Sequence, residues 1–235
     1  DGSFPNHEAN PLKEENMRDL RAKVLETRAD LGIAFDGDGD RSMFMDETGG
    51  IIPADFVTAL LAREMISREK GATILYDLRS SWVCKEEIEK YGGTPRMSRV
   101  GHSFIKAMMR KHRAIFAGEL SGHFYFRDMH YTDNAELAML SVLNLLSKEK
   151  QPLSQLVAPL KRYAASGEIN FEVADKDQAM KAVETTFATG AEVLHLDGLS
   201  VIHKDWWCNV RPSNTEPVLR LNLEARTPTL CAEMR

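Results

Sequence analysis

The alternation of helical and strand patterns between residues 51 and 162 is the feature that most constrains this fold. Residues 72–78 and 114–117 are short apolar runs typical of buried strands, and segments with apolar residues at helical spacing separate them. Asp55 and Ser103 are expected to cap two of those helices. Such β and α units in turn are typical of a sheet with helices on both faces. We therefore expect an α/β fold with mixed, mostly parallel sheets covered by helices.

The pattern changes after residue 162. One helix is expected at 175–188, and the rest of the segment reads as short strands joined by turns. Asp197-Gly198 lies between two of these strands and is a strong hairpin signal. Residues 163–235 are thus predicted to form an antiparallel α+β domain. Its last helical pattern starts at Thr227-Pro228 and stops after a few residues, so we expect this domain to be C-terminally truncated.

Residues 1–50 hold too few strands for a domain of their own. One helix is expected at 11–27, with Leu25 on its apolar face, and two brief strands at 31–35 and 43–45. A stable sheet needs about three strands and a covering layer. We expect three domains in all: the second half of a domain at 1–50, an α/β domain at 51–162 and the antiparallel α+β domain at 163–235.

Composition excludes several classes of protein. The 235 residues carry a formal net charge of −5, whereas nucleic-acid-binding domains usually show a net basic face. No apolar run approaches the roughly 18–20 residues of a membrane helix. The three cysteines, Cys84, Cys208 and Cys231, are too sparse for a disulfide framework and fit reduced thiols. We expect a cytoplasmic protein with no nucleic-acid or membrane partner.

An acidic, glycine-rich loop follows the apolar run at 31–35. Asp36, Asp38 and Asp40 alternate with Gly37 and Gly39. Three carboxylates this close repel one another unless a hard cation neutralises them, and oxygen ligands suit Mg²⁺ or Ca²⁺. A solvated turn is the alternative, since Asp and Gly are common turn residues. We favour a metal site.

Two known loop types share part of this pattern. An EF-hand also begins with alternating aspartates, but its sixth position is glycine where Arg41 stands, and a helix precedes it. A haloacid dehalogenase-type phosphatase would use Asp36 as nucleophile with Asp38 nearby, although Asp40 departs from its pattern. We reject the first and keep the second as an alternative.

Further polar loops interrupt the predicted strands. Glu119 and Ser121 lie in a glycine-flanked turn and offer hydrogen bonds to hydroxyl groups. His102 opens a predicted helix, and Arg79 follows a predicted strand where open α/β sheets bind ligands. Each residue alone is also compatible with an ordinary turn, cap or surface charge.

A loop near the C-terminus combines Arg211 with short polar residues. The arginine fork matches a phosphate, and Ser213, Asn214 and Thr215 add small hydrogen-bonding groups. Successive backbone N–H groups in such a turn can form an anion nest. Turn chemistry alone would also explain the serine, the asparagine and the prolines.

The loops together are far more specific than any one of them. The identity of these loops and their order along the chain closely resemble the α-D-phosphohexomutase family, and within it the bacterial phosphomannomutase/phosphoglucomutase group. The motifs that carry the resemblance are Phe4-Pro5-Asn6-His7, Asp36-Gly37-Asp38-Gly39-Asp40-Arg41, Gly101-His102-Ser103, Gly118-Glu119-Leu120-Ser121-Gly122-His123 and Arg211-Pro212-Ser213-Asn214-Thr215-Glu216-Pro217.

This resemblance implies an enzyme that moves phosphate between the 1- and 6-positions of a hexose, through a phosphoserine and a bisphosphorylated sugar. It implies Mg²⁺ as cofactor and mannose or glucose phosphates as substrates. It also implies that residues 1–50 are the second half of a metal-binding domain, 51–162 a sugar-binding domain and 163–235 a phosphate-binding domain. The residues that it marks are the metal ligands Asp36, Asp38 and Asp40, the catalytic candidates Arg41, Arg79 and His102, and the substrate-binding candidates Glu119, Ser121, His123, Arg211, Ser213, Asn214 and Thr215.

The chain departs from the family at two points. The catalytic serine of the family lies in a T-A-S-H-N-P-type segment, and these 235 residues contain none. Arg79 also stands where the family often has lysine, and arginine cannot exchange a proton. We expect this chain alone to show no mutase turnover. A non-catalytic sugar-phosphate-binding module is a further alternative, beside the aspartyl phosphatase that would use Asp36.

Overall fold

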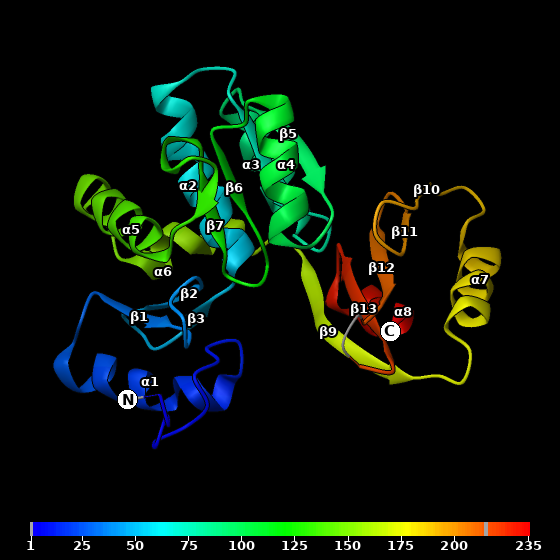
Figure 1. Ribbon diagram of the computed structural model, residues 1–235, viewed down its shortest axis with the longest axis horizontal. Coiled ribbons are helices and arrows are strands. Elements are labelled where there is room, and N and C mark those ends of the chain that lie inside the picture. Colours follow the sequence, from blue (N-terminus) through cyan, green and yellow to red (C-terminus); the bar gives the residue numbers. More distant parts are fainter. Residues whose placement is uncertain (1, 214–215) are drawn as a thin grey trace. The chain divides into compact units, whose positions relative to one another are not determined.

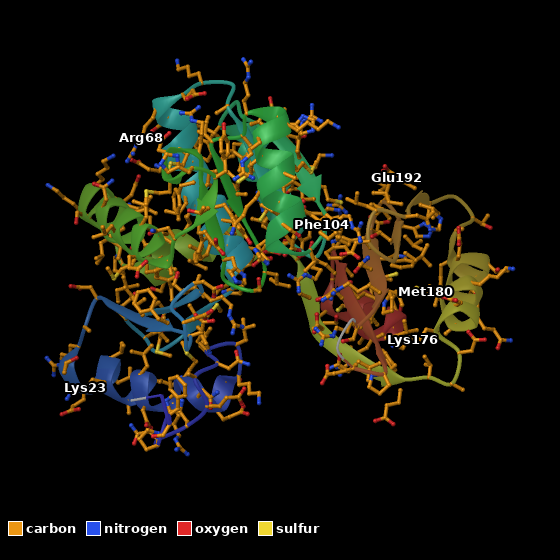
Figure 2. All side chains as sticks on the ribbon, in the orientation of Figure 1. Lys23, Arg68, Phe104, Lys176, Met180 and Glu192 are labelled. Carbon is orange, nitrogen blue, oxygen red and sulfur yellow. The ribbon has the colours of Figure 1, made fainter. Side chains whose placement is uncertain are left out.

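The computed structural model describes residues 2–213 and 216–235, which form two compact units, Asp1–Leu160 and Lys161–Arg235. Each unit is described by itself. Charged side chains lie on the surfaces of both units, among them the exposed Lys23, Arg68 and Glu192 (Figure 2). Within the described ranges, no helix combines the length and the apolar character needed to cross a membrane.

The first unit begins with a small antiparallel sheet, ordered β1-β2-β3 (Figure 1). The helix α1 packs on β1, and α5 contacts β2 from further along the chain. Every residue of β2 is buried, so this sheet is covered although it is small. The elements are η1 (Glu14–Met17), α1 (Arg18–Thr27), β1 (Leu31–Phe35), β2 (Ser42–Asp46), β3 (Ile51–Ile52) and α5 (Ala135–Glu149).

The larger sheet of this unit has the order β5-β4-β6-β7-β8. β4 pairs in parallel with β5 and β6, whereas β7 pairs antiparallel with β6 and β8. The expected mixed α/β architecture is therefore confirmed. The sheet is half parallel and half antiparallel, not mostly parallel as expected, because β6, β7 and β8 follow one another through short turns. Its elements are α2 (Ala54–Arg68), β4 (Thr73–Asp77), α3 (Trp82–Lys90), β5 (Thr94–Ser98), α4 (His102–His112), β6 (Phe116–Gly118), β7 (Phe124–Phe126), η2 (Arg127–Met129), β8 (Thr132–Asp133), α6 (Leu153–Val157) and η3 (Ala158–Leu160).

Helices cover both faces of this sheet. Ile105 and Met109 of α4 pack with Leu75, Ala117 and Tyr125 in one buried cluster. The helices α2 and α3 contact each other, and α2 contacts β4 and β6. The helix α2 packs closely on β6 at Gly118, because a Cβ built on Gly118 would lie 2.0 Å from the Oγ1 atom of Thr58 on α2. Parallel pairing sets Tyr76 of β4 opposite Gly118 of β6, so the loops that follow the two strands start side by side.

Three local sequence predictions were wrong. Asp55 is not a cap: α2 begins after Pro53, and the buried Asp55 carboxylate accepts the Ser81 N–H instead, at 3.0 Å. Ser103 lies inside α4, whose N-cap is Gly101. Leu25 is 51% exposed, because α1 turns Val24 toward the sheet. In each case tertiary packing overrode a local preference.

The second unit is an antiparallel sheet of order β10-β11-β12-β13-β9 with two helices, which confirms the expected C-terminal architecture. Asp175 and Thr227 cap these helices through their side chains. Gly198 has a positive φ of 67° in the turn before β11, as the hairpin signal indicated. The elements are β9 (Ala164–Glu172), α7 (Lys176–Phe187), β10 (Glu192–Leu194), β11 (Leu199–Ile202), β12 (Trp206–Pro212), β13 (Val218–Ala225) and α8 (Pro228–Met234).

Candidate functional site

The acidic loop connects β1 to β2 in the first unit. Antiparallel pairing of the two strands brings Phe35 opposite Ser42, so the loop closes tightly. The Asp36 carboxylate accepts the Arg41 N–H at 3.0 Å and the Arg41 Nε–H at 2.5 Å. Gly39 has a φ of 76°, a conformation that residues with a side chain rarely adopt. The backbone therefore turns all three aspartates into one small volume.

The three carboxylates of this loop form a candidate metal site. One oxygen from each of Asp36, Asp38 and Asp40 lies within 4.8 Å of the others. Burial raises the pKa of Asp40, and the charges of Asp36 and Asp38 add to this although His123 opposes it. Burial also disfavours the charged form of Asp36, but the Arg41 hydrogen bonds and charge lower its pKa. Crowded oxygen donors of this kind fit a hard divalent cation.

A second polar loop joins β6 to β7. It is a tight hairpin in which Glu119 N–H donates to the His123 carbonyl at 3.0 Å. The Glu119 side chain is almost fully buried, and both of its oxygens have protein donors. Gly101 N–H donates to Oε1 at 2.9 Å, and the Tyr125 hydroxyl donates to Oε2 at 2.5 Å. The carboxylate thus joins this loop to the start of α4.

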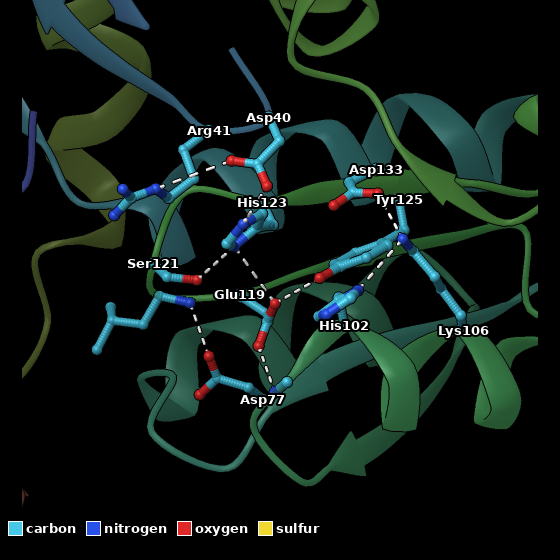
Figure 3. Close-up of polar contacts among 12 residues, drawn as sticks. Asp40, Arg41, Asp77, His102, Lys106, Glu119, Ser121, His123, Tyr125 and Asp133 are labelled. Atoms are coloured by element: carbon cyan, nitrogen blue, oxygen red, sulfur yellow. Dashed lines mark hydrogen bonds and ion pairs between the residues drawn. The ribbon is translucent and has the colours of Figure 1, made fainter. Parts of the chain in front are cut away.

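The acidic loop and the β6–β7 loop are in contact (Figure 3). The His123 Nε2 atom lies 3.2 Å from the Asp40 Oδ2 atom, and its Nδ1 atom lies 2.8 Å from the Ser121 Oγ atom. Ser42 N–H donates to the Gly122 carbonyl at 3.0 Å. The structure therefore brings together the metal-ligand and sugar-binding candidates of the first unit.

Arg79 lies at the carboxyl end of β4 and is bound to Asp77. Its Nη2 atom lies 2.7 Å from the Asp77 Oδ2 atom, and its own N–H also donates to this carboxylate, at 2.7 Å. Asp77 is fully buried and accepts the Leu120 N–H at 2.7 Å as well. One buried carboxylate thus connects Arg79 to the loop that carries Glu119.

The sequence analysis missed Asp77 and Tyr125, and also a charged pair beside His102. The Lys106 Nζ atom lies 2.7 Å from the Asp133 Oδ1 atom and 3.5 Å from the His102 Nδ1 atom. Asp133, Asp40 and His123 form a second group of possible metal ligands. The Lys106 ammonium already neutralises Asp133, so the acidic loop is the better candidate. No motif marks these residues, because strand pairing brings Asp77, Tyr125 and Asp133 to the site and the packing of α4 on the sheet brings Lys106.

The remaining candidates lie in the second unit. Arg211 is buried at the end of β12, and its Nη2 atom lies 3.3 Å from the Glu168 Oε2 atom. Ser213 N–H donates to the Val218 carbonyl at 2.9 Å, and its hydroxyl accepts the Glu216 N–H at 3.2 Å. Asn214 and Thr215 lie outside the described residues. Within the described residues, the Ser213 hydroxyl and the buried Arg211 guanidinium are the polar groups placed at this end of β12.

Gly122 is a structural requirement of the loop contact. Its φ is 90°, and a Cβ there would lie 3.1 Å from the Ser42 carbonyl oxygen and 3.2 Å from the Met43 Sδ atom. We expect Gly122→Ala to lower the free energy of unfolding by about 2 kcal/mol, from backbone strain and contact together. Gly71→Ala is the matched control, since Gly71 has a φ of 75° and open space around it.

Urea unfolding of both variants checks this prediction. Gly71→Ala carries only the backbone strain, about 1 kcal/mol. Equal losses in the two variants would show that the space beside Ser42 is not needed.

Comparisons with known proteins match the whole chain to one family. Residues 1–50, 53–163 and 168–235 match the models described as "Phosphoglucomutase/phosphomannomutase, alpha/beta/alpha domain II", "Phosphoglucomutase/phosphomannomutase, alpha/beta/alpha domain III" and "Phosphoglucomutase/phosphomannomutase, C-terminal domain". A phosphomannomutase of Methanocaldococcus jannaschii is 45% identical over 225 residues, which are 96% of this chain and 50% of that protein. A phosphomannomutase of Escherichia coli is 43% identical over 237 residues, covering 100% of this chain and 52% of that one.

Solved structures agree with these relatives. A phosphoglucomutase/phosphomannomutase family protein from Burkholderia thailandensis superposes with a TM-score of 0.90 at 36% identity. The match covers 100% of this chain and 51% of that one. The chain thus spans about half the length of the relatives and of the structure that it matches.

Proposed function

Because this chain belongs to the phosphoglucomutase/phosphomannomutase family, we propose that it is the metal- and substrate-binding part of a phosphohexomutase. The whole protein would interconvert hexose 1- and 6-phosphates through a phosphoserine and a bisphosphorylated sugar. The observation that best supports this is the contact between the Asp40 and His123 side chains, because it joins a cation site to a hydroxyl-binding loop.

The acidic loop is the proposed Mg²⁺ site. Asp36, Asp38 and Asp40 would hold the ion, whose charge would offset the charge on a transferring phosphoryl group. Arg41 orients Asp36 by two hydrogen bonds. The same two bonds argue against an aspartyl phosphatase, in which the Asp36 carboxylate would have to attack phosphorus.

The β6–β7 loop is the proposed sugar site. A carboxylate has about four lone pairs, and Gly101 and Tyr125 occupy two of those on Glu119. The remaining lone pairs of Glu119 would accept hydrogen bonds from sugar hydroxyls. Ser121 and His123 would also bind sugar hydroxyls, from the same loop. His102 is the first residue of α4 and follows Gly101, whose N–H donates to Glu119 of this loop. Its Nδ1 atom lies 3.5 Å from the Lys106 Nζ atom.

The proposed role of Arg79 differs from the proton-exchanging role that a lysine could have at this position. Its guanidinium stays charged at any working pH, so it supplies charge and hydrogen bonds and exchanges no proton. Its pairing with Asp77 orients the side chain at the end of β4, where open α/β sheets bind ligands. We assign it to phosphate contact.

The turn after β12 is the proposed anion site. Arg211, Ser213, Asn214 and Thr215 would hold the phosphate that is not transferred, which orients the sugar. The substrate must turn around between two half-reactions. A site made of charge and short donors accepts either phosphate position, which suits that requirement.

Binding and turnover measurements with this chain test the proposal. We expect saturable binding of glucose 1-phosphate or mannose 1-phosphate by calorimetry, and no mutase turnover without the serine segment. Turnover at the rate of a complete enzyme would contradict the second expectation. If the chain releases inorganic phosphate and Asp36→Asn abolishes this release, the phosphatase is supported instead. If the chain binds neither sugar phosphate, the proposal that it is a substrate-binding part is refuted.

A cytoplasmic location is part of the same proposal. Cys84, Cys208 and Cys231 are buried thiols, none of them in a disulfide bond within the described residues, and burial raises the pKa of Cys208 to about 11. Buried thiols of this kind fit a reducing compartment.

A further inference from the structure

Tyr125 carries a polar group into an apolar cluster. It lies at the centre of β7, is fully buried, and packs with Leu75, Ala117 and the α4 side chains Ile105 and Met109. Its hydroxyl donates to the Glu119 Oε2 atom at 2.5 Å. Burial and the Glu119 charge raise the pKa of Tyr125, so the hydroxyl keeps its proton and acts as a donor.

The Glu119 carboxylate is held from two sides. The Tyr125 hydroxyl donates to one oxygen, and Gly101 N–H donates to the other at 2.9 Å. The carboxylate cannot rotate about its last torsion without breaking both bonds. Loss of either donor leaves an oxygen of this mostly buried carboxylate with one hydrogen-bond partner fewer.

The Gly101 bond extends this arrangement to another loop. Gly101 is the N-cap of α4, with a φ of 115°, and His102 is the first residue of the helix. Figure 3 shows the Tyr125 hydroxyl pointing at Glu119, with His102 and Lys106 on the neighbouring helix. A buried hydroxyl, a buried carboxylate and a backbone N–H therefore connect β7 to the helix that carries His102.

We propose that Tyr125 is a positioning residue, which orients the Glu119 carboxylate toward sugar hydroxyls and, through Gly101, holds the start of α4. The part that concerns hydroxyls rests on the proposed function. The link to Gly101 depends only on the contacts within the first unit. A tyrosine that merely filled the core would affect stability but neither Gly101 nor ligand binding.

Tyr125→Phe tests this proposal, with Tyr76→Phe as the matched control. Tyr76 is also mostly buried, but it follows Leu75 on β4 and so lies on the opposite face of the sheet from Tyr125. Loss of a hydrogen bond to a charged group changes an equilibrium constant by about tenfold or more. We expect the Gly101 amide proton of the ligand-free chain to exchange about tenfold faster in Tyr125→Phe and at the wild-type rate in Tyr76→Phe.

Ligand binding gives the second measurement. Tyr125→Phe is expected to weaken glucose 1-phosphate binding about tenfold, measured by calorimetry, and Tyr76→Phe to leave it unchanged. If the wild-type chain binds no sugar phosphate, the proposed function fails, whereas Gly101 exchange still decides the positioning role. Unchanged Gly101 exchange in a folded Tyr125→Phe overturns the proposal.

A measurement that leaves Tyr125 unchanged covers the case in which Tyr125→Phe does not fold. The wild-type chain, labelled at its tyrosines, should show a slowly exchanging hydroxyl proton of Tyr125 by NMR, because the bond to Glu119 is short and buried. That proton should shift in Glu119→Gln. Its absence from the wild-type spectrum overturns the proposal.

Discussion

We expect Asp38→Asn to lower the affinity of this chain for Mg²⁺ by about two orders of magnitude, since affinity at oxygen sites varies by decades with the number of ligand charges. Asp38 is the best of the three aspartates for this test. It is exposed, whereas the Asp36 carboxylate is bound to Arg41 and Asp40 lies against His123. Its replacement therefore removes a ligand charge without disturbing the fold. Calorimetric titration with Mg²⁺ at constant ionic strength measures the change.

Asp128→Asn is the control for that titration. The Asp128 side chain is 85% exposed and pairs only with Arg127 among the contacts of the described chain, so it carries the same charge change outside the acidic loop. We expect wild-type Mg²⁺ affinity in this variant. Equal affinity in Asp38→Asn and the wild type would contradict the assignment of the acidic loop as the cation site.

The main architecture was predictable because its elements are long enough to show a period. The strand expected at 72–78 is β4, Thr73–Asp77, and the helix expected at 175–188 is α7, Lys176–Phe187. In contrast, β3 and β8 have two residues each, and no alternation is visible over two residues. Such strands exist only because a neighbouring strand pairs with them.

The candidate site divides in the same way. Asp36, Asp38 and Asp40 were predicted because their spacing is local, and the structure does bring their oxygens together. Asp77 and Tyr125 were not predicted, because strand pairing places them. The parallel register of β4 and β6 sets Tyr76 opposite Gly118, which brings Asp77 beside the Glu119 loop. Residues that hold a site in place across a sheet leave no mark in a short motif.

Asp77→Ala is expected to lower the free energy of unfolding of the first unit by roughly 3–5 kcal/mol, because it breaks a buried ion pair. The Arg79 guanidinium loses its carboxylate and the Leu120 N–H loses its acceptor, in a place where Asp77 is fully buried. Amide hydrogen exchange in β4 and β6 measures this loss within the first unit.

The double variant Asp77→Leu with Arg79→Met is the control for this loss. It replaces both charges by apolar side chains of similar size, so the part of the stability lost to the unpaired buried charge should return. The Leu120 and Arg79 N–H groups still lack the Asp77 acceptor, so that smaller part of the loss remains. If the double variant is as unstable as Asp77→Ala, the loss comes from packing and these backbone hydrogen bonds and not from a buried charge.

Acid pH gives an independent check on Asp77. Burial alone would raise the pKa of this carboxyl, but the Arg79 charge and the hydrogen bonds from Arg79 and Leu120 outweigh it and lower the pKa. In the unfolded chain the pKa is about 3.9. The folded state thus keeps Asp77 ionised to lower pH, and its stabilisation is full above about pH 4 and lost as the pH falls through the lowered value. The difference in unfolding free energy between wild type and Asp77→Ala should therefore be constant from about pH 5 to 8 and shrink below about pH 4. A difference that stays constant on acidification would show that the carboxylate charge does not stabilise the fold.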